Sequence, residues 1–320
     1  MNKEFFTGKK VLIMGLGRFG GGVDAAEFAV KAGAKMIVTD LAQQQQLADS
    51  VDRLKGFADI EFHFGCHQES DFEWADIIIV NPAVPDDNRF LKIARQHNKF
   101  ITSQINIFFQ LCPATVIGVT GTNGKSTTAA LLAHLLRSHE KVWLGGNIGN
   151  RPLLAVIDQI KSSDLVVLEL SSFQTKQLAQ IQKGPQAALL TNLTPNHLDR
   201  HGSFADYCTA KENIFRFQKC DGNRPAVSVF NAEDKIGAEW FEKYRKEAGR
   251  VCMQFSADDI SDQLRAQFTL PGQANLSNLA AAVCVARHFG VTDETIKTSL
   301  SEFKSLPHRL ELIAERNGVR

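Results

Sequence analysis

The sequence lacks any strong imbalance of charge. Lysine and arginine together number 36 and aspartate and glutamate 35, which leaves a formal net charge of +1 over 320 residues. Proteins that bind nucleic acids or anionic membranes through a broad electrostatic surface usually carry a clear excess of basic residues. We therefore expect no nucleic-acid or membrane partner, and we expect any anionic ligand to be held by a local site.

Cysteine pairs and long apolar runs are also missing. The six cysteines are scattered, with no C-x-x-C pair and no cluster of cysteine and histidine at metal-ligand spacing, so we interpret them as reduced thiols. No apolar run approaches the ~18 residues of a membrane span, and the first residues, MNKEFFTGKK, contain no apolar segment typical of a secretory signal. These absences favour a cytoplasmic protein.

Length and composition indicate a globular protein of two domains. At about 150 residues per domain, a chain of 320 residues is long enough for two. Hydrophobic residues make up 44% and charged residues 22%, a balance that supplies enough apolar side chains for real cores. Short apolar runs alternate with longer amphipathic segments, which is the pattern of βαβ units and a parallel sheet.

The first series of apolar runs predicts a Rossmann-like domain over residues 1–103. Its strands are VLIMG, MIVTD and DIIIV, and the amphipathic segments that follow them predict helices over 18–33, 43–55 and 86–97. The boundary lies near 100–113, where a short helix ends at Pro113.

A second series, which starts at residue 114, predicts a central α/β domain over residues 104–304. Its strands are TVIGVTG, DLVVLEL, QAALLTNL and AVSVF, and its helices are expected over 125–138, from residue 173, and over 204–218, 235–248, 275–290 and 293–303. The last residues, 305–320, begin as a strand and then stop. We interpret them as a hinge into a further domain that this chain lacks.

A glycine-rich motif follows the first strand. Gly15-Leu16-Gly17-Arg18-Phe19-Gly20 opens the first helix, and Asp40 ends the next strand. Glycines in this position let the backbone approach a phosphate, and the helix N-terminus supplies N–H groups and partial positive charge. The motif predicts a nucleotide of some kind, with NAD as one candidate, because G-x-G-x-x-G indicates the fold better than the ligand.

A second phosphate-binding motif, G-T-N-G-K-S at Gly121–Ser126, lies between the strand TVIGV and a helix rich in alanine and leucine. Backbone N–H groups of such a loop wrap a β-phosphate, Lys125 neutralises the β- and γ-phosphates, and the hydroxyl of Ser126 or Thr127 can ligate Mg²⁺. A valine stands where the strict P-loop pattern has its first glycine. The position between a strand and a helix nevertheless predicts a phosphate site.

Ionisable residues at the ends of the next strands have two interpretations each. Glu169 ends the apolar strand DLVVLE, where it could form a salt bridge or, beside a P-loop, hold Mg²⁺. His197 alone would be a surface residue, and Lys211 alone would extend its amine to solvent. Both lie in the stretch TNLTPNHLDRHGSFADYCTAKENIF, which gathers several ionisable residues after a strand, so functional roles are the alternative interpretation.

Taken together, the strings resemble the Mur ligases of peptidoglycan synthesis. G-T-N-G-K-S-T, E-L-S-S-F-Q, N-x-x-x-x-H-L-D-R-H-G-S, Y-x-x-A-K-x-x-I-F, G-x-x-N-x-x-N and L-P-H-R-L-E occur in the order that this family shows, from residue 15 to residue 311. The resemblance implies a Rossmann-like domain, a central P-loop ATPase-like domain and a third domain that would follow the hinge.

On the ATP side, the resemblance implies two Mg²⁺ ions and four catalytic side chains. Lys125 and Ser126 would hold the phosphates and the first Mg²⁺, which Glu169 would complete. His197 would bind the second Mg²⁺ together with Lys211, which in such ligases carries a carbamate. CO₂ adds only to an uncharged amine, and burial would disfavour the ammonium form. The implied ATP-binding residues are Gly121, Thr122, Asn123, Gly124, Lys125, Ser126, Thr127, Asn275, Asn278, His308 and Arg309.

On the substrate side, the resemblance favours a uridine nucleotide over NAD. In this family the first domain binds the UDP group of a UDP-linked sugar, and the central domain contacts its muramoyl part. The implied substrate-binding residues are Gly15, Gly17, Arg18, Phe19, Gly20, Asp40, Asn81, Pro82, Asn147, Ser171 and Gln174.

The S-S-F-Q ending and the first G-L-G-x-x-G resemble the branch that adds D-glutamate to UDP-N-acetylmuramoyl-L-alanine. The implied reaction is ATP-dependent, passes through an acyl phosphate and has UDP-N-acetylmuramoyl-L-alanine, ATP and D-glutamate as partners. We expect a monomer. Because the chain stops after the hinge, we also expect it to be inactive by itself.

The sequence departs from the family pattern in two motifs, besides ending at Arg320 just after the hinge. Ala274 stands where the pattern G-x-H-N-x-x-N has histidine, and Asn81-Pro82-Ala83 stands where the family reads S-P-G.

Three alternative functions stay open. One is a related acyl-phosphate ligase with another amine substrate, and a second is a non-catalytic fragment that binds a UDP-sugar and ATP. A third, an NAD-dependent oxidoreductase, would require nicotinamide binding.

Overall fold

The computed structural model describes residues 1–304, apart from residues 19, 58, 139–140, 149–152 and 221–223. These residues form two compact units. The first unit comprises Met1–Pro113, the described residues of Gly145–Lys161, and Phe173–Lys183, and the remaining segments form the second. The two units therefore interleave along the sequence.

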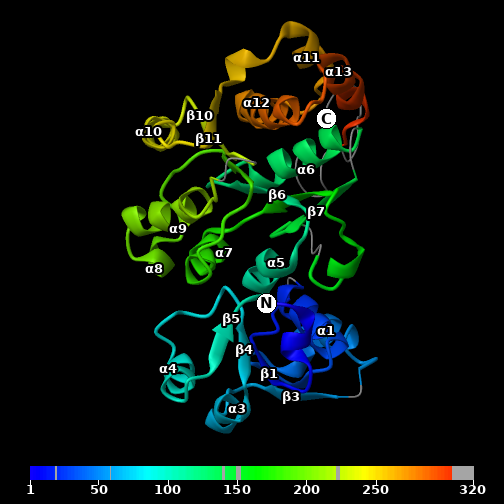
Figure 1. Cartoon of the computed structure of the whole chain (residues 1–320), viewed down its shortest axis with the longest axis vertical. Coiled ribbons are helices and arrows are strands. Elements are labelled where there is room, and N and C mark those ends of the chain that lie inside the picture. Colours follow the sequence, from blue (N-terminus) through cyan, green and yellow to red (C-terminus); the bar gives the residue numbers. More distant parts are fainter. Residues whose placement is uncertain (19, 58, 139–140, 149–152, 221–223, 305–320) are drawn as a thin grey trace, which may run out of the picture. The chain divides into compact units, whose positions relative to one another are not determined.

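The first unit contains a five-stranded sheet of order β3-β2-β1-β4-β5 (Figure 1). Each neighbouring pair runs parallel, and Val11 of the central strand lies opposite both Met36 and Ile77. Its elements are β1 (Lys10–Met14), α1 (Gly21–Lys31), β2 (Lys35–Asp40), α2 (Ala48–Asp52), β3 (Ile60–Phe64), α3 (Glu69–Trp74), β4 (Ile77–Val80), α4 (Arg89–Gln96), β5 (Phe100–Thr102), α5 (Gln104–Leu111) and most of α7 (Ser172–Gln177), with short 3-10 turns η1 (Lys3–Phe6), η2 (Gln44–Leu47), η3 (Ile157–Gln159) and η4 (Leu178–Gln180).

The second unit contains a six-stranded sheet of order β11-β10-β9-β6-β8-β7 (Figure 1). The pairs of β6 with β8 and β9, and of β10 with β9 and β11, are parallel. Its elements are β6 (Thr115–Thr120), α6 (Lys125–Leu136), β7 (Val142–Gly146), β8 (Leu165–Glu169), β9 (Ala187–Leu190), α8 (Leu198–His201), α9 (Phe204–Arg216), β10 (Ala226–Asn231), α10 (Lys235–Tyr244), β11 (Arg250–Phe255), η5 (Ala257–Asp259), α11 (Asp262–Gln267), α12 (Gln273–His288) and α13 (Asp293–Glu302).

Capping side chains explain where several helices begin. Ser103 Oγ accepts a hydrogen bond from Asn106 N at the start of α5, and Ser203 Oγ accepts one from Asp206 N at the start of α9. Each bond satisfies one of the N–H groups that the first turn of a helix leaves without a partner, which stabilises the helix by about 1 kcal/mol. These starts agree closely with the predicted helix over 204–218 and with the short helix that precedes Pro113.

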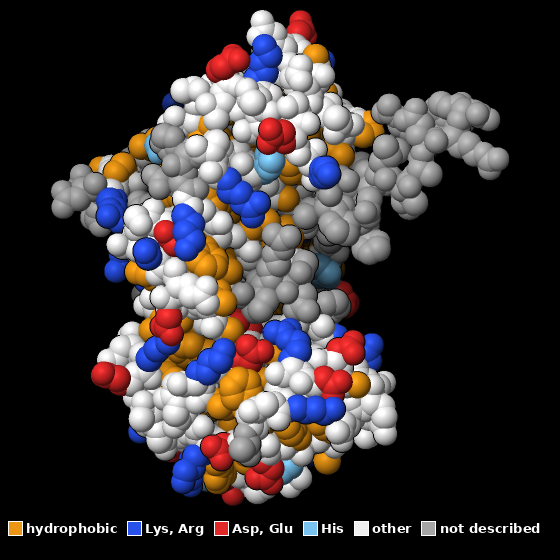
Figure 2. Space-filling model, turned by 90° about the vertical axis from the view of Figure 1, so that its right-hand side faces the viewer, with side chains coloured by type: hydrophobic (Ala, Val, Ile, Leu, Met, Phe, Trp, Pro, Cys, Tyr) orange, Lys and Arg blue, Asp and Glu red, His pale blue; other side chains and the backbone are white. Residues whose placement is uncertain are grey.

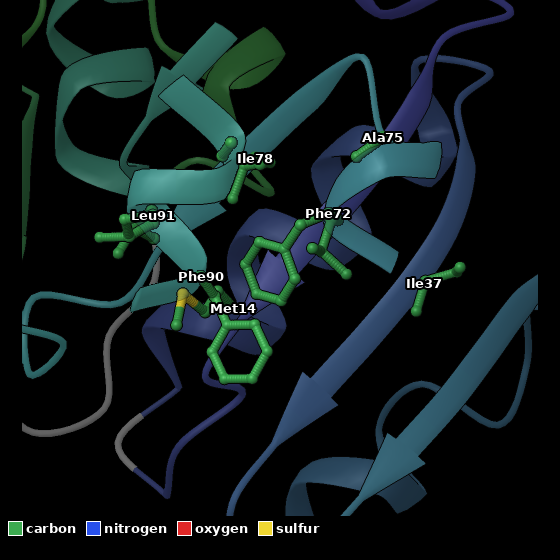
Figure 3. Close-up of a cluster of buried hydrophobic side chains, with 10 residues drawn as sticks. Met14, Ile37, Phe72, Ala75, Ile78, Phe90 and Leu91 are labelled. Carbon is green, nitrogen blue, oxygen red and sulfur yellow. The ribbon is translucent and has the colours of Figure 1, made fainter. Parts of the chain in front are cut away.

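The core on one face of the first sheet is built around two phenylalanines (Figure 3). The rings of Phe72 and Phe90 stack with centroids 5.0 Å apart and an interplanar angle of 22°. Met14 from β1 and Ile78 from β4 pack in the same buried cluster. Apolar side chains from the sheet and from α3 and α4 thus hold these helices on the sheet.

The predicted fold class is confirmed, since both units are α/β with parallel sheets. The apolar runs predicted the interior strands of both sheets. The strands that they did not predict are β3 and β5 in one sheet and β7 and β11 in the other, and each of these lies at an edge. Only the interior strands of a parallel sheet are buried on both faces, so only they need continuous apolar runs.

The predicted helix over 43–55 is wrong in extent. Instead, the chain forms the short turn η2 and then the five-residue helix α2. Gln46 accepts a hydrogen bond from Gln43 N through its side chain, which closes η2 as a separate turn. A run of glutamines offers no apolar stripe to bury, so packing does not extend the helix through it. Among the described residues, three further short helices, α3, α8 and α11, were not predicted.

The surface does not concentrate charge of one sign on the face shown in Figure 2, where the described acidic and basic side chains are interspersed. This pattern accords with the formal net charge of +1. Within residues 1–304 and outside the gaps named above, the structure contains no helix with the length and apolar character needed to cross a bilayer.

Replacement of Phe72 tests the phenylalanine core. Phe72→Ala should destabilise the fold by about 3–5 kcal/mol, because the side chain is 0% exposed and its removal leaves a cavity between β1, β4 and α4. Leu41→Ala is the control, since Leu41 is 65% exposed and should change stability by less than about 0.5 kcal/mol. The measurement is guanidinium unfolding followed by circular dichroism, and equal losses in the two variants would contradict the assignment of this core.

Candidate active site

The G-T-N-G-K-S loop connects β6 to α6 at the carboxyl edge of the second sheet. β6 lies between β8 and β9, and the register places Val119 opposite Glu169 and Thr120 opposite Leu190. Because parallel strands bring their carboxyl ends to the same edge, the residues that follow three different strands surround the loop. Ligands of open α/β sheets bind at this kind of position.

The loop turns into α6 at Gly124, which has φ +81°. A Cβ atom there would collide with Asn278 Oδ1, so the left-handed turn and the close approach both require glycine. The N–H groups of the first turn of α6 point toward the loop and carry partial positive charge. Lys125 follows at once, and its Nζ donates to Thr122 O over 2.8 Å. The loop therefore offers backbone donors and a cation to a phosphate.

Residues that follow β9 form hydrogen bonds with the phosphate loop. Thr122 N donates to Asn192 O over 2.8 Å, and Asn123 N donates to Asn192 Oδ1 over 3.0 Å. Thr191 Oγ1 donates to Asn123 O over 2.6 Å. These bonds satisfy the polar groups on the outer side of the loop and hold its backbone in one conformation, so a ligand need not order it.

Tyr207 of α9 forms a buried hydrogen bond with the phosphate loop. Its Oη lies 3.1 Å from Thr122 Oγ1, and the tyrosine is only 1% exposed. Thr122 Oγ1 donates its proton to Thr194 O, so Tyr207 is the donor in the shared contact. The Tyr207 ring also faces Lys211, whose Nζ lies 4.9 Å from the ring centroid. One buried side chain thus contacts both the phosphate loop and this lysine.

Lys211 is buried, with 1% of its surface exposed, and its Nζ donates to Thr120 Oγ1 over 3.3 Å. The pKa of its amine lies well below the ordinary lysine value. Burial is the largest cause, the nearby positive charge of Lys125 lowers the pKa further, and Glu169 partly opposes both. The sequence-based default of a solvent-directed amine is therefore wrong, and this lysine has a markedly increased tendency to be uncharged.

Glu169 and Ser126 are also buried, with 2% and 4% of their surfaces exposed. A carboxylate and a hydroxyl are hard oxygen donors of the kind that Mg²⁺ binds beside phosphates. The donor set therefore fits a magnesium ion on an ATP phosphate. Among the described residues, no group of three or more His, Cys, Asp and Glu side chains forms a metal cluster.

His197 differs from these residues in its surroundings. It lies on an exposed stretch, with φ +51°, immediately before the short helix α8. A non-glycine residue in the left-handed region is uncommon and is often found at functional turns. His201, one turn further along, lies 2.9 Å through Nε2 from Ser172 Oγ and packs against the Tyr207 ring.

Helix α12 brings two asparagines to the phosphate loop. Asn278 Oδ1 accepts a hydrogen bond from Thr128 Oγ1 of α6 over 3.3 Å, and Asn278 Nδ2 donates to Asn275 Oδ1. Both asparagines are 8% exposed. Ala274, where the family pattern has histidine, is exposed on the first turn of the same helix.

In the first unit, the predicted nucleotide residues meet at the carboxyl edge of β1, β2 and β4. Gly15 has φ +88°, and a Cβ atom there would lie 2.8 Å from Asn81 Cβ. Asn81 Nδ2 donates to Gly15 O over 3.2 Å. Asp40 accepts hydrogen bonds from Gly17 N at 3.0 Å and from Ala42 N at 2.9 Å. Three segments distant in sequence thus form one edge site.

The other predicted substrate residues have varied surroundings. Arg18 and Asn147 are exposed, Pro82 and Ser171 are half-buried, and Gln174 is buried. Gly20 is the residue immediately before α1, with φ +80°. Phe19, His308 and Arg309 lie outside the described residues, so their predicted roles stay predictions.

Sequence reasoning missed four residues around the phosphate loop: Thr120, Thr191, Asn192 and Tyr207. Three of them follow or end strands, where a threonine or asparagine looks like ordinary turn chemistry. Tyr207 lies in the motif Y-x-x-A-K together with Lys211, but the sequence analysis predicted no contact between the two residues. The spacing of four between the two residues places them on one face of a helix and could have suggested the contact.

Comparison with known proteins decides the family. The Mur ligase middle domain matches residues 119–269, and the Mur ligase MurD-like N-terminal domain matches residues 9–103. UDP-N-acetylmuramoylalanine–D-glutamate ligase of Roseiflexus sp. (strain RS-1) is 37% identical over 98% of this chain and 72% of its own length. The enzyme with the same name from Acetivibrio thermocellus is 33% identical over 99% of this chain and 70% of its own length. The chain belongs to the Mur ligase family.

Solved structures of Mur ligases share the fold. UDP-N-acetylmuramate–alanine ligase MurC of Thermotoga maritima superposes with a TM-score of 0.60 at 21% identity and covers 97% of this chain and 72% of its own. UDP-N-acetylmuramate:L-alanyl-γ-D-glutamyl-meso-diaminopimelate ligase of Neisseria meningitides superposes with a TM-score of 0.64 at 18% identity and covers 94% and 99%. At these identities the likeness extends to the fold alone.

Replacement of Gly124 tests the phosphate loop of this Mur ligase. Gly124→Ala should abolish measurable ATP binding, because the left-handed backbone and the collision with Asn278 Oδ1 would force the loop out of shape. Gly56→Ala is the control, since nothing lies within 4 Å of a Cβ atom there. The measurement is calorimetric titration with ATP and Mg²⁺, and unchanged ATP affinity of Gly124→Ala would exclude this loop as the ATP site.

Replacement of Tyr207 tests its hydrogen bond with Thr122 of the phosphate loop. Tyr207→Phe removes the hydrogen bond to Thr122 Oγ1 and should weaken ATP binding by about fivefold, which corresponds to about 1 kcal/mol for one buried hydrogen bond. Tyr244→Phe is the matched control, because Tyr244 is also buried in the second unit and donates to Glu212 Oε1. A similar change of ATP affinity in both variants would refute a specific role for Tyr207.

Proposed function

We propose that this chain binds ATP and UDP-N-acetylmuramoyl-L-alanine for the ATP-dependent addition of D-glutamate to the alanyl carboxylate of that substrate, a step of peptidoglycan precursor synthesis. The observation that carries this proposal is the group of three buried residues, Lys211, Thr120 and Glu169, beside the half-buried Lys125 of the phosphate loop. The relatives at 37% and 33% identity that bear the name of this reaction support it.

In this proposal, residues 104–304 bind ATP and residues 1–103 bind the UDP group. The backbone N–H groups at the start of α6 and the amine of Lys125 hold the β- and γ-phosphates. Their positive charge offsets the negative charge that builds up as the terminal phosphoryl group passes to the alanyl carboxylate. The products of that step are ADP and an acyl phosphate.

The second step forms the amide. The uncharged amine of D-glutamate attacks the carbonyl carbon of the acyl phosphate and gives a tetrahedral intermediate. Collapse of that intermediate breaks the bond between the carbon and the phosphate oxygen and releases inorganic phosphate. The nitrogen loses a proton to solvent, which leaves the amide. Lys125 stabilises the charge on the phosphate that leaves.

Ser126 and Glu169 would hold Mg²⁺, because both are buried oxygen donors at the carboxyl edge of the second sheet. The ion, when bound, would neutralise charge on the ATP phosphates. His197 and Lys211 would hold a second ion, for which an amine alone is a poor ligand. An oxygen-bearing group on Lys211 would make it a suitable one.

We propose that Lys211 acquires this oxygen-bearing group as a carbamate. Its lowered pKa favours the uncharged amine, which adds to the carbon of CO₂ and then loses a proton. The resulting carbamate would carry two oxygens and a negative charge at a position where the charges of Lys125 and Glu169 are both felt. Lys125 and a bound cation would stabilise that charge, so burial of the modified side chain would be less unfavourable than burial of an ammonium ion next to Lys125.

The first unit would take the uridine nucleotide. Gly15, Gly17 and Gly20 have positive φ angles, and without side chains they let a phosphate approach the backbone before α1. The Asp40 carboxylate has lone pairs besides the two that accept hydrogen bonds from backbone N–H groups. All six cysteines are free thiols, and ATP and UDP-linked precursors are made in the cytoplasm, so we place the reaction in that compartment.

Two measurements test the proposal. Calorimetric titration should give saturable binding of UDP-N-acetylmuramoyl-L-alanine and none of NAD⁺, and binding of NAD⁺ instead would overturn the proposed function. In a version of the chain extended to the length of its relatives, phosphate release from ATP should require both UDP-N-acetylmuramoyl-L-alanine and D-glutamate. If another amino acid replaced D-glutamate with a higher rate, the related ligase with a different amine substrate would be the correct function.

Replacement of Lys211 tests the carbamate. In the version extended to the length of its relatives, Lys211→Ala should reduce the rate of amide formation by about a hundredfold or more, and short carboxylates such as acetate should restore part of it. With ¹³C-labelled bicarbonate, the wild-type chain should give a carbamate signal in the NMR spectrum that Lys211→Ala lacks. Lys243→Ala is the control, because Lys243 is an exposed lysine of the same unit, paired with Glu212. A carbamate signal that survives Lys211→Ala would refute the assignment.

A further inference from the structure

Asp24 is a carboxylate buried completely, 0% exposed, in the first turn of α1. Its Oδ1 accepts a hydrogen bond from Ala155 N over 2.7 Å. Its Oδ2 accepts from Leu154 N over 3.1 Å and from Gln104 Nε2 over 2.7 Å. One side chain thus joins three segments of the first unit that lie 80 and more than 100 residues apart in sequence. Nothing in the mechanism above uses this carboxylate.

Two of the segments that Asp24 joins lie close in sequence to residues proposed to hold the UDP-linked substrate. On one side, α1 begins immediately after the glycine-rich loop, and Gly20 lies four residues before Asp24. On the other side, Leu154 lies seven residues after Asn147, which follows β7. Gln104, the third partner, is the first residue of α5. The bonds of Asp24 therefore hold Leu154, Ala155 and Gln104 against the helix that begins at the glycine-rich loop.

We propose that Asp24 is a positioning residue that holds Leu154 and Ala155 against α1, the helix that begins at the glycine-rich loop, and thereby sets the affinity for the UDP-linked substrate. This inference rests on the proposed function, because it concerns the substrate assigned there. Asp24 itself need not touch the substrate.

The electrostatics of the site separate this role from a purely structural one. Burial, as the largest cause, raises the pKa of Asp24 from 3.8 to about 6, although its three donors lower it. Glu27, on the next turn, raises it slightly. Helix α5 and residues 153–157 carry no charged residue, so no cation compensates the carboxylate from those elements.

The sign of this shift means that the ionised carboxylate weakens the fold. A folded-state pKa above the unfolded value gives stability that is fully present below about pH 3.8 and is lost as the pH rises through about 6. At neutral pH the Asp24 side chain is therefore mostly ionised, and its ionisation lowers the stability of the fold. The advantage of the carboxylate is geometric, because its two oxygens accept from two consecutive backbone N–H groups at once, whereas an asparagine has one acceptor oxygen.

The test compares Asp24→Asn with Asp76→Asn in the full chain. Asp76 is a matched control because its Oδ2 also accepts from a backbone N–H, that of Lys10, where β1 begins and thus at the opposite edge of the same sheet. Calorimetry gives the affinity for UDP-N-acetylmuramoyl-L-alanine. Hydrogen exchange followed by mass spectrometry gives the protection of the Leu154 and Ala155 amides, which requires no ligand. Guanidinium unfolding gives stability.

Asp24→Asn should weaken substrate binding by about tenfold and accelerate exchange at Leu154 and Ala155, with no loss of stability at neutral pH. Asp76→Asn should leave both affinity and exchange unchanged. Wild-type affinity should also fall between about pH 7.5 and about pH 5.5 as Asp24 gains a proton, and Asp24→Asn should lack this dependence.

Three results would overturn the inference. If Asp24→Asn bound the substrate as tightly as wild type, or exchanged these amides no faster, Asp24 would not position the segment. If the pH dependence persisted in Asp24→Asn, another group would cause it. Absence of substrate binding by the wild-type chain would instead overturn the proposed function, and the two failures are therefore distinguishable.

Discussion

The parallel register of β6 with its two neighbours is the constraint on which the second unit depends. It places Thr120, Glu169 and the residues after Leu190 at one edge, so that side chains from three strands surround a single loop. Thr120 joins them, because its hydroxyl donates to Leu170 O and accepts from Lys211 Nζ. A slip of one residue in either ladder would turn alternate side chains to the opposite face and separate these groups. Register, set by backbone hydrogen bonds, thus determines which charges interact.

The interior of both sheets could be predicted from sequence, and their edges could not. Strands such as Ile77–Val80 are buried along their whole length and leave an unbroken apolar run. Ile60–Phe64 at one edge reads I-E-F-H-F and is mostly half-buried, so its residues face both core and solvent without a clear pattern. An edge strand pairs on one side only and is half exposed, which removes the composition signal on which prediction relies. The helices were predicted where an apolar stripe repeats, and the glutamine run failed because it has none.

Residues of the candidate sites could be predicted where chemistry demands a particular side chain in a contiguous motif. Lys125 and Gly15 belong to such motifs, and their local geometry follows from a strand, a turn and a helix. Asp24 could not be found in this way, because its partners lie at Gln104 and Leu154 and only the folded chain brings them together. The burial of Lys211 is likewise a property of packing, since its neighbours on α9 gave no reason to exclude an amine directed to solvent. Long-range contacts and desolvation are the information that a single sequence does not display.

The interleaving of the two units has a consequence for how the protein is made. The first unit takes in Gly145–Lys161 and Phe173–Lys183, so its structure cannot be complete when Pro113 leaves the ribosome. Until Ala155 follows, the Asp24 carboxylate lacks two of its donors, and until Gln180 follows, Asn106 Nδ2 lacks its two acceptors. Water must occupy these positions during synthesis. Vectorial translation therefore delays consolidation of the first unit until the phosphate loop and the first strands of the second unit have also emerged.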